Sequence, residues 1–569
     1  MTQSEGGKPD SGAPLTATAP RIAGPEEIAM APRGPGPARQ GLLALAAYLA
    51  VFILLYAFPL VRHPGLPQVG QATLDPNFYV WSWRWWPYAL THGLNPLFSA
   101  QVGAPAGYNL AWTTTVPAVA VVLIPVTAAF GPIVSFNLTL LLAAPVSAWA
   151  AFVAARRLTG RFWAALVAGA VYGFSWYEVD ETGAGHPNLC VILLLPLMLY
   201  LVLLWRGGKL GRTAFVVLMA VAMAAEFYVF EETFAEMTAL GAAALVIGFA
   251  LARPADRCAV ARLAWLTAVA WVVAVVLASP YLVYALRHAP PQFVKVSPAF
   301  SLDLKDLVDP VSGIVLLLIL LGLAVLTWSS RLTRLLVIGF VLIIALAIGP
   351  DPVISGTQYS AVPWARLWYL PVARSAEPLR LMIFGSLVLA IAVALWLAMP
   401  GKNRALLALR WVLGLAAVAA IVAYIPTASR GSAIPAGAPS AAVRPTRALP
   451  AFLDDGLYRR YLRPGEIVVV VSNRGNAGLI FQADTNFYMR IAGGFVNRSF
   501  STATGLPAPV ENLRHPTPAL ERQFLAYVHQ AGVGAILVER AWKAPWMKVF
   551  GRIGLHGTLV GGVIVYPIA

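Results

Sequence analysis

Asp75 is the only acidic residue between positions 62 and 115, in a long segment that separates two apolar stretches of the chain. Because Pro76 follows it, helical geometry is disfavoured at Asp75 itself, and the carboxylate is expected at the start of a helix. An isolated carboxylate of this kind can act as a general base and accept the proton of an attacking hydroxyl group. The same position also suits a helix N-cap, a role that is compatible with catalysis.

Aromatic residues crowd the segment 77–90 that follows Asp75. Tyr79, Trp83 and Trp86 recur at helical spacing, which predicts an amphipathic helix lying in the membrane interface with its rings at headgroup level. Tyr79 and Trp83 are candidates for stacking on a sugar or for contact with a lipid tail. Plain interfacial anchoring of these rings is the alternative.

A second polar group lies in YEVDETGAGHPNL, residues 177–189, which contains Glu178, Asp180, Glu181 and His186. Three carboxylates and an imidazole suit an acid–base relay or the orientation of an acceptor. They also suit a divalent cation such as Mg²⁺ or Mn²⁺, for which Glu181 and His186 are the candidate ligands. A solvated loop is the alternative reading of this segment.

A third acidic group places Glu226 within an apolar stretch and Glu231, Glu232 and Glu236 at the turn that follows. Like charges so close to lipid would repel unless they were protonated, paired or bound to a cation. Glu231 and Glu232 are therefore candidate pocket residues. Solvated carboxylates at the membrane interface are the alternative.

Cations lie near these acidic groups in the predicted topology. Arg374 and Arg380 flank Pro378 at the beginning of an apolar stretch, and Lys295 lies in another connection. Arginine is well suited to clamp phosphate oxygens, so these three residues are candidates for binding a phosphate group. Alternatively, the two arginines snorkel to the membrane interface without a ligand.

The composition shows what kind of protein must position these residues. Of 569 residues, 59% are hydrophobic and only 12% are charged, and the mean hydropathy is +0.72. These values exclude an ordinary soluble enzyme, and two cysteines exclude a disulfide framework. The net charge of +16 is explained in a membrane protein by basic residues in cytoplasmic loops and in contact with anionic lipids. No nucleic-acid partner is therefore expected.

The apolar stretches predict a polytopic membrane helical bundle with about eleven spans. They are 41–60, 133–155, 162–178, 189–205, 213–230, 234–251, 263–284, 311–328, 334–349, 381–399 and 405–425. The shorter stretch 116–130 contains Pro117 and Pro125 and is predicted to be a re-entrant or interfacial segment that does not cross. With this assignment all Arg-rich connections lie in the cytoplasm, as does the N-terminus, and the acidic groups lie outside.

The chain is accordingly divided into a disordered cytoplasmic tail (1–40), a transmembrane domain (41–425) and an extracytoplasmic domain (426–569). The first outer loop covers 62–132. In the last domain, β-branched runs at 467–471, 533–539 and 561–568 predict strands, and 518–532 predicts a helix that stops at Gly532. Alternating strands and helices predict a small α/β fold.

The first 400 residues resemble the GT-C superfamily of integral membrane glycosyltransferases, in which an acidic residue follows the first span. Asp75 occupies that place. The segments DPNFYVWSWRWWPYALTHGLNPLFS, APAGYNLAWTT, GHPNL, FEE and LPVARSAEPLR further resemble a group of actinobacterial multi-pass proteins of that superfamily. The resemblance implies that His186 and Glu232 line the pocket. Many members have a second acidic residue in the first loop, for which the carboxylates at 178–181 are candidate substitutes.

Residue chemistry and resemblance together predict a bacterial plasma-membrane glycosyltransferase that uses a polyprenyl-phosphate sugar. Asp75 is expected to deprotonate an extracytoplasmic glycan, lipid or protein acceptor, and the arginines to hold the donor phosphate. Membrane lipids are the expected surroundings. Two alternatives remain: a transporter or flippase of lipid-linked glycans, and a non-enzymatic cell-envelope assembly factor. Transporters bind near the membrane midplane, where the predicted spans carry few charges.

Overall fold

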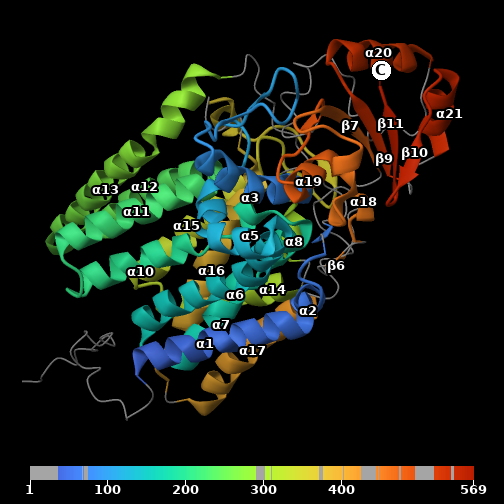
Figure 1. Ribbon diagram of the computed structural model, residues 1–569. Helices are drawn as coiled ribbons and strands as arrows, with labels where there is room; N and C mark the ends of the chain where they lie inside the picture. Colours follow the sequence, from blue (N-terminus) through green and yellow to red (C-terminus); the bar gives the residue numbers. More distant parts are fainter. Residues whose placement is uncertain are drawn as a thin grey trace, which may run out of the picture.

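A bundle of long helices carries a smaller part with a β-sheet at one end (Figure 1). The structure is a computed structural model of the chain. It describes residues 36–66, 68–69, 75–289, 301–308, 311–370, 376–401, 403–424, 444–445, 448–472, 476–493, 518–539 and 544–568. Residues 1–35 of the predicted tail (1–40), Lys295 and Arg374 lie outside these residues, whereas positions 37–40 of that tail already belong to the first helix.

Within the described residues, eight helical segments are long and apolar enough to cross a membrane. They are Pro37–Arg62 (α1 Pro37–Phe52, η1 Ile53–Ala57 and α2 Phe58–Arg62), α6 (Pro132–Thr159), Pro187–Arg206 (α9 Pro187–Cys190 and α10 Leu194–Arg206), α11 (Arg212–Val229), α12 (Glu231–Leu251), α13 (Pro254–Arg287), Pro378–Ala398 (η6 Pro378–Leu381 and α16 Met382–Ala398) and α17 (Arg404–Tyr424). The other three predicted stretches lie on the shorter helices α7 (Phe162–Gly173), α14 (Val311–Thr327) and α15 (Arg331–Ala347). The chain is thus a multi-pass, mainly α-helical membrane protein.

Small residues allow α7 to pack closely against α6. A Cβ atom added to Gly173 would lie 2.5 Å from the backbone of Ala148, and one added to Gly169 would lie 2.6 Å from the Ala148 carbonyl oxygen. Helices approach this closely in membranes where small residues line the interface. The predicted stretch 162–178 is interrupted at Phe174, and its last residues belong to a new helix, α8 (Trp176–Ala184).

The Pro-containing stretch 116–130 forms two short helices, α4 (Pro117–Val122) and α5 (Ile124–Phe130). They contain six and seven residues, and a span needs about 20. Val116 before α4 has a left-handed backbone with φ of 48°, and the helix breaks at Leu123. This division agrees with the prediction that the segment does not cross.

The C-terminal module, which we define as the described residues from 448 to 568, contains a five-stranded sheet of order β10-β11-β9-β7-β8. Strand β7 (Ile467–Val471) runs parallel to β8 (Arg490–Ile491) and β9 (Ala535–Glu539), whereas β11 (Val563–Pro567) is antiparallel to β9 and β10 (Thr558–Val560). The predicted strands at 467–471, 533–539 and 561–568 and the helix at 518–532 are confirmed, the last as α20 (Pro518–Gln530).

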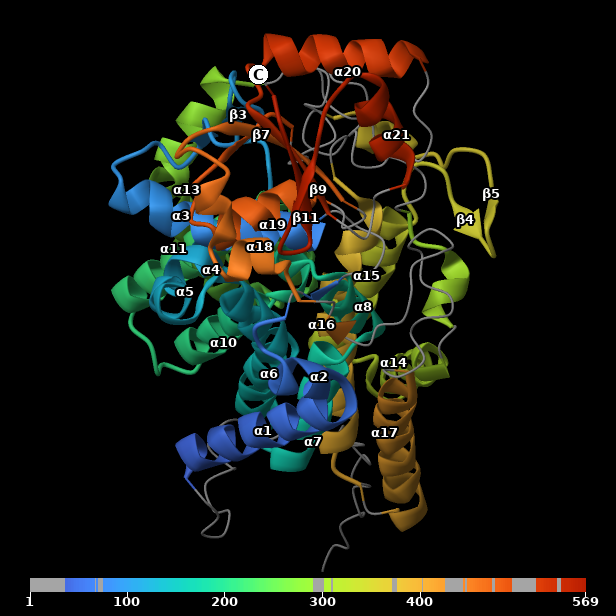
Figure 2. The same cartoon turned by 45° about the vertical axis from the view of Figure 1, so that its right-hand side comes forward.

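Both faces of this sheet are covered, which explains why its strands are continuously apolar. Val469 and Val471 pack with α20 and α21 (Ala544–Arg552). Val468 and Val470 belong instead to the large core that includes α19 (Ala477–Asp484) and the helical bundle. The sheet is therefore built into the core of the protein, and Figure 2 shows α19 beside α3 (Asp75–Thr91).

The aromatic segment after Asp75 is helical, as predicted, but most of its rings are buried in the protein and do not face lipid headgroups. Trp81, Trp83 and Trp85 are almost completely buried, because α3 packs against α6 and α4 and is covered by α19. The expected contact of these rings with lipid headgroups was therefore wrong. Its physical reason is that α19, from the far end of the chain, removes the rings of α3 from lipid and water.

Candidate functional site

The turn between α8 and α9 brings His186 to the beginning of α3. Helix α8 starts at Ser175, whose hydroxyl accepts the Glu178 backbone N–H at 3.4 Å, and ends at Gly185. Gly185 has a φ of +77°, and a Cβ atom there would lie 2.9 Å from the Pro76 ring. The positive φ and the close approach both require glycine, so the local sequence sets the position of His186 next to Asp75.

His186 bridges two carboxylates. Its Nε2 atom lies 3.2 Å from Asp75 Oδ2, and its Nδ1 atom lies 2.6 Å from Glu181 Oε2. Burial by itself lowers the pKa of His186, but the hydrogen bonds and charges of Asp75 and Glu181 outweigh it and raise the pKa to about 10. At neutral pH the ring is therefore an imidazolium held between two carboxylates, and the predicted proximity of Asp75, Glu181 and His186 is realised.

A buried hydrogen bond next to this bridge joins α3 to α9. The Tyr79 hydroxyl donates to Asn188 Oδ1 at 2.7 Å. Tyr79 lies one helical turn after Asp75, and Asn188 lies two residues after His186, so the bond fixes the two elements that carry the Asp75–His186 contact. Sequence reasoning missed the role of Asn188, although it lies in the quoted segment GHPNL.

The predicted sugar-stacking role of Tyr79 and Trp83 does not fit their surroundings. Both rings are buried. Tyr79 stacks on Phe136 at 6.5 Å between ring centres, and Trp83 meets the same ring edge-on at 6.0 Å. Since protein atoms already cover these rings, neither presents a face to a sugar in this structure.

Arg380 lies in an ion cluster with two carboxylates. Its Nη1 atom pairs with Glu232 Oε2, and its Nη2 atom lies 3.0 Å from Glu377 Oε2. Glu232 Oε1 also accepts the Glu377 backbone N–H at 2.6 Å, and the guanidinium lies 5.0 Å from the centre of the Phe230 ring. The predicted cation is thus neutralised by protein groups. Glu377 was missed, although its spacing of three residues from Arg380 is a signal for such a pair.

The Arg380 cluster is electrostatically close to the Asp75–His186 bridge. Burial raises the pKa of Tyr79 well above its usual value, the charge of Asp75 raises it further, and the charge of Arg380 lowers it. One tyrosine hydroxyl therefore senses both groups. The predicted pocket residues Glu181, His186 and Glu232 are accordingly gathered at one end of the bundle with Asp75.

The remaining predicted acidic residues are mostly inside the protein. Glu178 is fully buried, and Asp180, Glu226 and Glu236 are each less than one tenth exposed. Both carboxylate oxygens of Glu178 lack a hydrogen-bond partner among the residues that the structure describes. The solvated-loop reading of 177–189 is thereby excluded, because the segment is largely helical and packed. Glu231 is the first residue of α12, where a helix N-terminus favours negative charge.

The predicted metal ligands Glu181 and His186 bind one another. Both ring nitrogens of His186 face carboxylates, so a cation would have to displace one of these hydrogen bonds. Over the described parts of the chain, no group of three or more His, Cys, Asp and Glu side chains is arranged as a metal site.

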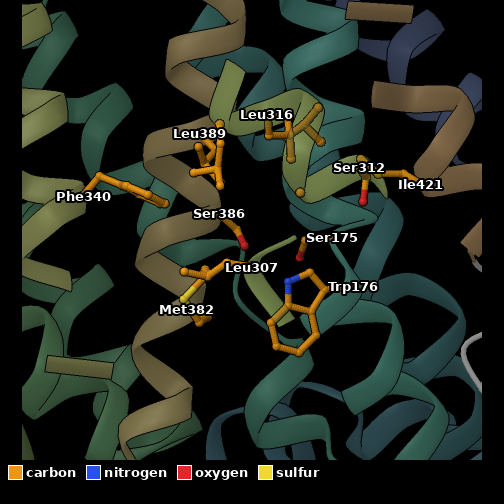
Figure 3. A pocket seen from close by; sticks show the side chains of 13 residues that line it. Ser175, Trp176, Leu307, Ser312, Leu316, Phe340, Met382, Ser386, Leu389 and Ile421 are labelled. Carbon is orange, nitrogen blue, oxygen red and sulfur yellow. The ribbon is translucent and has the colours of Figure 1, made fainter. Parts of the chain in front are cut away.

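An apolar cavity lies behind the start of α8, between α7, α14, α15, α16 and α17 (Figure 3). Its volume is about 30 Å³, and the surrounding empty space, counted together with the part open to solvent, is about 480 Å³. Leucine, valine, isoleucine, phenylalanine and methionine side chains line most of it, together with the three serines Ser175, Ser312 and Ser386. Ser175 also caps α8, so the cavity and the Asp75–His186 bridge lie at opposite ends of one short helix. Isolated serines in apolar helices were the only sequence signal for it.

No family model matches the chain, and no curated protein sequence is significantly similar to it. Solved structures do resemble it. The arabinofuranosyltransferase AftD from Mycobacteria has a TM-score of 0.58 at 16% identity, over 94% of this chain and 40% of AftD. The oligosaccharyltransferase AglB from Archaeoglobus fulgidus, in complex with an inhibitory peptide and a dolichol-phosphate, has a TM-score of 0.53 at 11% identity. The match covers 93% of this chain and 74% of AglB.

A third similar structure is ArnT from Cupriavidus metallidurans bound to undecaprenyl phosphate, with a TM-score of 0.51 at 12% identity, over 93% of this chain and 98% of ArnT. The chain spans less than half the length of AftD but nearly the whole of ArnT. The buried helices, the polar end of the bundle and these similarities together establish that the chain has the GT-C fold.

Proposed function

We propose that the protein transfers a sugar from a polyprenyl-phosphate donor to a hydroxyl group of a glycan, lipid or protein acceptor. The observation that carries this proposal is the contact between Asp75 and His186 at the start of α3. It combines a partly exposed carboxylate, 41% accessible, with a charged imidazolium that is 16% accessible. Lipid phosphates bound to the similar structures of AglB and ArnT support the choice of donor.

Asp75 is the general base in this proposal. The carboxylate takes the proton of the acceptor hydroxyl, and the acceptor oxygen forms a bond to the anomeric carbon of the sugar. The bond between that carbon and the phosphate oxygen breaks, so polyprenyl phosphate leaves and the configuration inverts. The His186 imidazolium orients Asp75 and stabilises its ionised form before the acceptor arrives.

Arg380 stabilises the leaving phosphate in this proposal. Its bond to Glu377 Oε2, at 3.0 Å, is the one that a donor phosphate would replace, because Glu232 is held at the same time by the Glu377 backbone N–H. A bidentate guanidinium can keep Glu232 on one edge and bind phosphate oxygen on the other. The apolar cavity beside Ser175 accommodates part of the lipid tail.

We place this site on the extracytoplasmic side of the plasma membrane. Two arginine-rich connections lie side by side, because Arg331 Nη1 pairs with Asp256 Oδ2 at 2.6 Å. A third arginine-rich connection follows α6. In the last turn of α6, Arg156 Nε donates to Gln40 Oε1 near the start of α1. The positive-inside rule assigns these connections to the cytoplasm, so the Asp75 end of the bundle and the C-terminal module lie outside.

The test is transfer by the purified full-length protein in lipid nanodiscs, supplied with a panel of radiolabelled sugars on undecaprenyl phosphate and a cell-envelope glycan extract. Asp75→Asn is expected to reduce transfer by about 10²–10⁴-fold, the usual contribution of general base catalysis. Asp256→Asn is the matched control, since Asp256 is paired with Arg331 away from the site. Wild-type transfer by Asp75→Asn would exclude Asp75 as the base. Export of label across the membrane without covalent transfer would indicate a transporter.

A further inference from the structure

Gln482, in helix α19 of the C-terminal module, makes three hydrogen bonds, one of them to α3 and one to the loop that follows it. Its Oε1 accepts the indole N–H of Trp81 at 2.9 Å, and its Nε2 donates to the carbonyl oxygens of Gln101 at 2.7 Å and Met489 at 2.9 Å. Both Gln482 and Trp81 are fully buried. Because an indole N–H only donates and carbonyls only accept, only an amide in this orientation satisfies all three partners.

Phe487, which follows α19, reaches the same helix by a strained backbone. Asn486 and Phe487 have φ values of 53° and 60°, which are uncommon for a non-glycine residue and unfavourable for a bulky one. The strained turn places the Phe487 ring 5.8 Å from Trp81, 5.5 Å from Trp85 and 4.6 Å from Tyr88, measured between ring centres. Three residues on one face of α3, at i, i+4 and i+7 spacing, thus contact one ring of the module.

The segment after α3 is joined to the module by backbone hydrogen bonds. Ile491 N–H donates to Gln101 O at 2.8 Å, and Ala104 N–H donates to Ile491 O at 2.9 Å. Val102 forms a parallel bridge with Ile491, the last residue of strand β8. The loop therefore extends the edge of the five-stranded sheet, and α3 is held by the module along its side and just beyond its C-terminal end.

From these contacts we infer that the C-terminal module positions the catalytic carboxylate, with Gln482 and Phe487 as positioning residues for Asp75. The catalytic meaning of this inference rests on the proposed function, whereas the mechanical part does not. Trp81 lies six residues after Asp75, about 9 Å along a helix. A tilt of α3 at Trp81 therefore displaces Asp75 from His186 Nε2, to which it is hydrogen bonded at 3.2 Å.

The test compares Gln482→Met, which keeps the length of the side chain and removes its polar atoms, with Ser472→Ala. Ser472 is an equally buried residue of the module whose hydroxyl donates to Glu539 Oε2 at 2.5 Å. Ser472 directly follows β7, whereas the loop after α3 contacts the sheet at β8. Trp81→Phe is the second variant should Gln482→Met fail to fold, since it removes the donor N–H together with part of the ring and leaves Gln482 in place.

A spin label on Thr91→Cys, in a Cys258→Ser background, reports the motion of α3 without any substrate. Thr91 is exposed at the end of α3, and the remaining Cys190 is buried. The label is expected to become more mobile in Gln482→Met and Trp81→Phe and to remain unchanged in Ser472→Ala. An unchanged label in both interface variants overturns the inference, whatever the enzymatic result.

Transfer kinetics then test the positioning role. Gln482→Met is expected to lower kcat by about tenfold or more, as small misplacements of a catalytic group do, with KM for the donor little changed. The alkaline limb of its pH profile moves to lower pH, because His186 loses contact with Asp75. Greater mobility of the label with wild-type kcat and pH profile overturns the positioning role. Greater mobility in a protein whose wild type transfers no sugar supports the mechanical contact and contradicts the proposed function.

Discussion

His186 and Asp75 are separated by 111 residues in the chain, yet the imidazole Nε2 lies 3.2 Å from the Asp75 carboxylate. The other ring nitrogen is held by Glu181 at 2.6 Å. The ring therefore has a carboxylate at each nitrogen, which favours its charged form. The protonation state of this one imidazole links the pH of the solution to the geometry of the proposed base.

Transfer is expected to fall as the pH rises through about 10, the pKa to which Asp75 and Glu181 raise His186. In the unfolded chain a histidine has a pKa of about 6.5. Because the pKa of His186 is raised in the folded protein, the protonated ring contributes to folding stability. This contribution is fully present below about pH 6.5 and is lost as the pH increases through the folded-state pKa. Glu181→Gln should move this alkaline limb down by about 1–3 pH units. Rate profiles measured between pH 6 and 11 check this, with Glu521→Gln, whose partner is the exposed Arg552, as the control. An unmoved limb would show that His186 does not control the reaction.

Tyr79→Phe should destabilise the protein by about 1–3 kcal/mol, because it leaves the buried Asn188 Oδ1 without its donor while preserving the ring. The loss is measured as a lower unfolding midpoint in detergent micelles. Tyr461→Phe removes a hydroxyl from a side chain of the module that is 45% exposed, and its midpoint should not change. Equal midpoints for the two variants would contradict the structural role of the Tyr79–Asn188 bond.

Arg380→Gln should be strongly destabilising, since it leaves Glu232 buried without its cation, a change that costs about 3–5 kcal/mol. The double variant Arg380→Gln with Glu232→Gln removes both charges and should recover most of the unfolding midpoint. It should not recover transfer, because the proposed phosphate ligand is missing. Recovery of both properties in the double variant would exclude Arg380 from donor binding.

Ser386→Met extends a longer apolar side chain into the cavity of Figure 3 and should raise KM for a long-chain polyprenyl donor by about tenfold. A donor with a short tail should be used as well as by the wild type, since it does not reach the cavity. Leu318→Met, at a position that is 49% exposed on α14, controls for the substitution itself. The same KM change with both donors would argue against a lipid tail in this cavity.

Local rules in the sequence predicted most of the individual elements. Apolar length located the helices of the bundle, Pro76 placed Asp75 at a helix start, and the run Ile467–Val471 predicted a strand. These predictions succeeded because each depends on residues that are neighbours in the chain. Even the proximity of Asp75 and His186 followed from the shared side of two connections in the predicted topology.

The surroundings of the site could not be predicted, because they depend on distant partners. Trp81 has the sequence context of an interfacial ring, and its burial involves distant partners such as Gln482, which lies 401 residues away. From its sequence context, Arg380 is likewise expected to be an unpaired cation at the start of an apolar helix. Its partner Glu232 is 148 residues distant in the chain. Residue type and spacing predicted the chemical groups of the site, while tertiary packing determined which of them are exposed and which are paired.

The shortness of α7 has a consequence for how the site is reached. Its twelve residues rise about 18 Å, whereas the hydrocarbon layer of a membrane is about 30 Å thick. Its antiparallel neighbour α6 continues for 28 residues, so the chain turns into α8 well before the level at which α6 begins. The carboxylates of α8 are therefore expected to lie deeper in the membrane than the start of α6. Water-soluble carboxylate reagents should reach them more slowly than reagents that partition into the membrane.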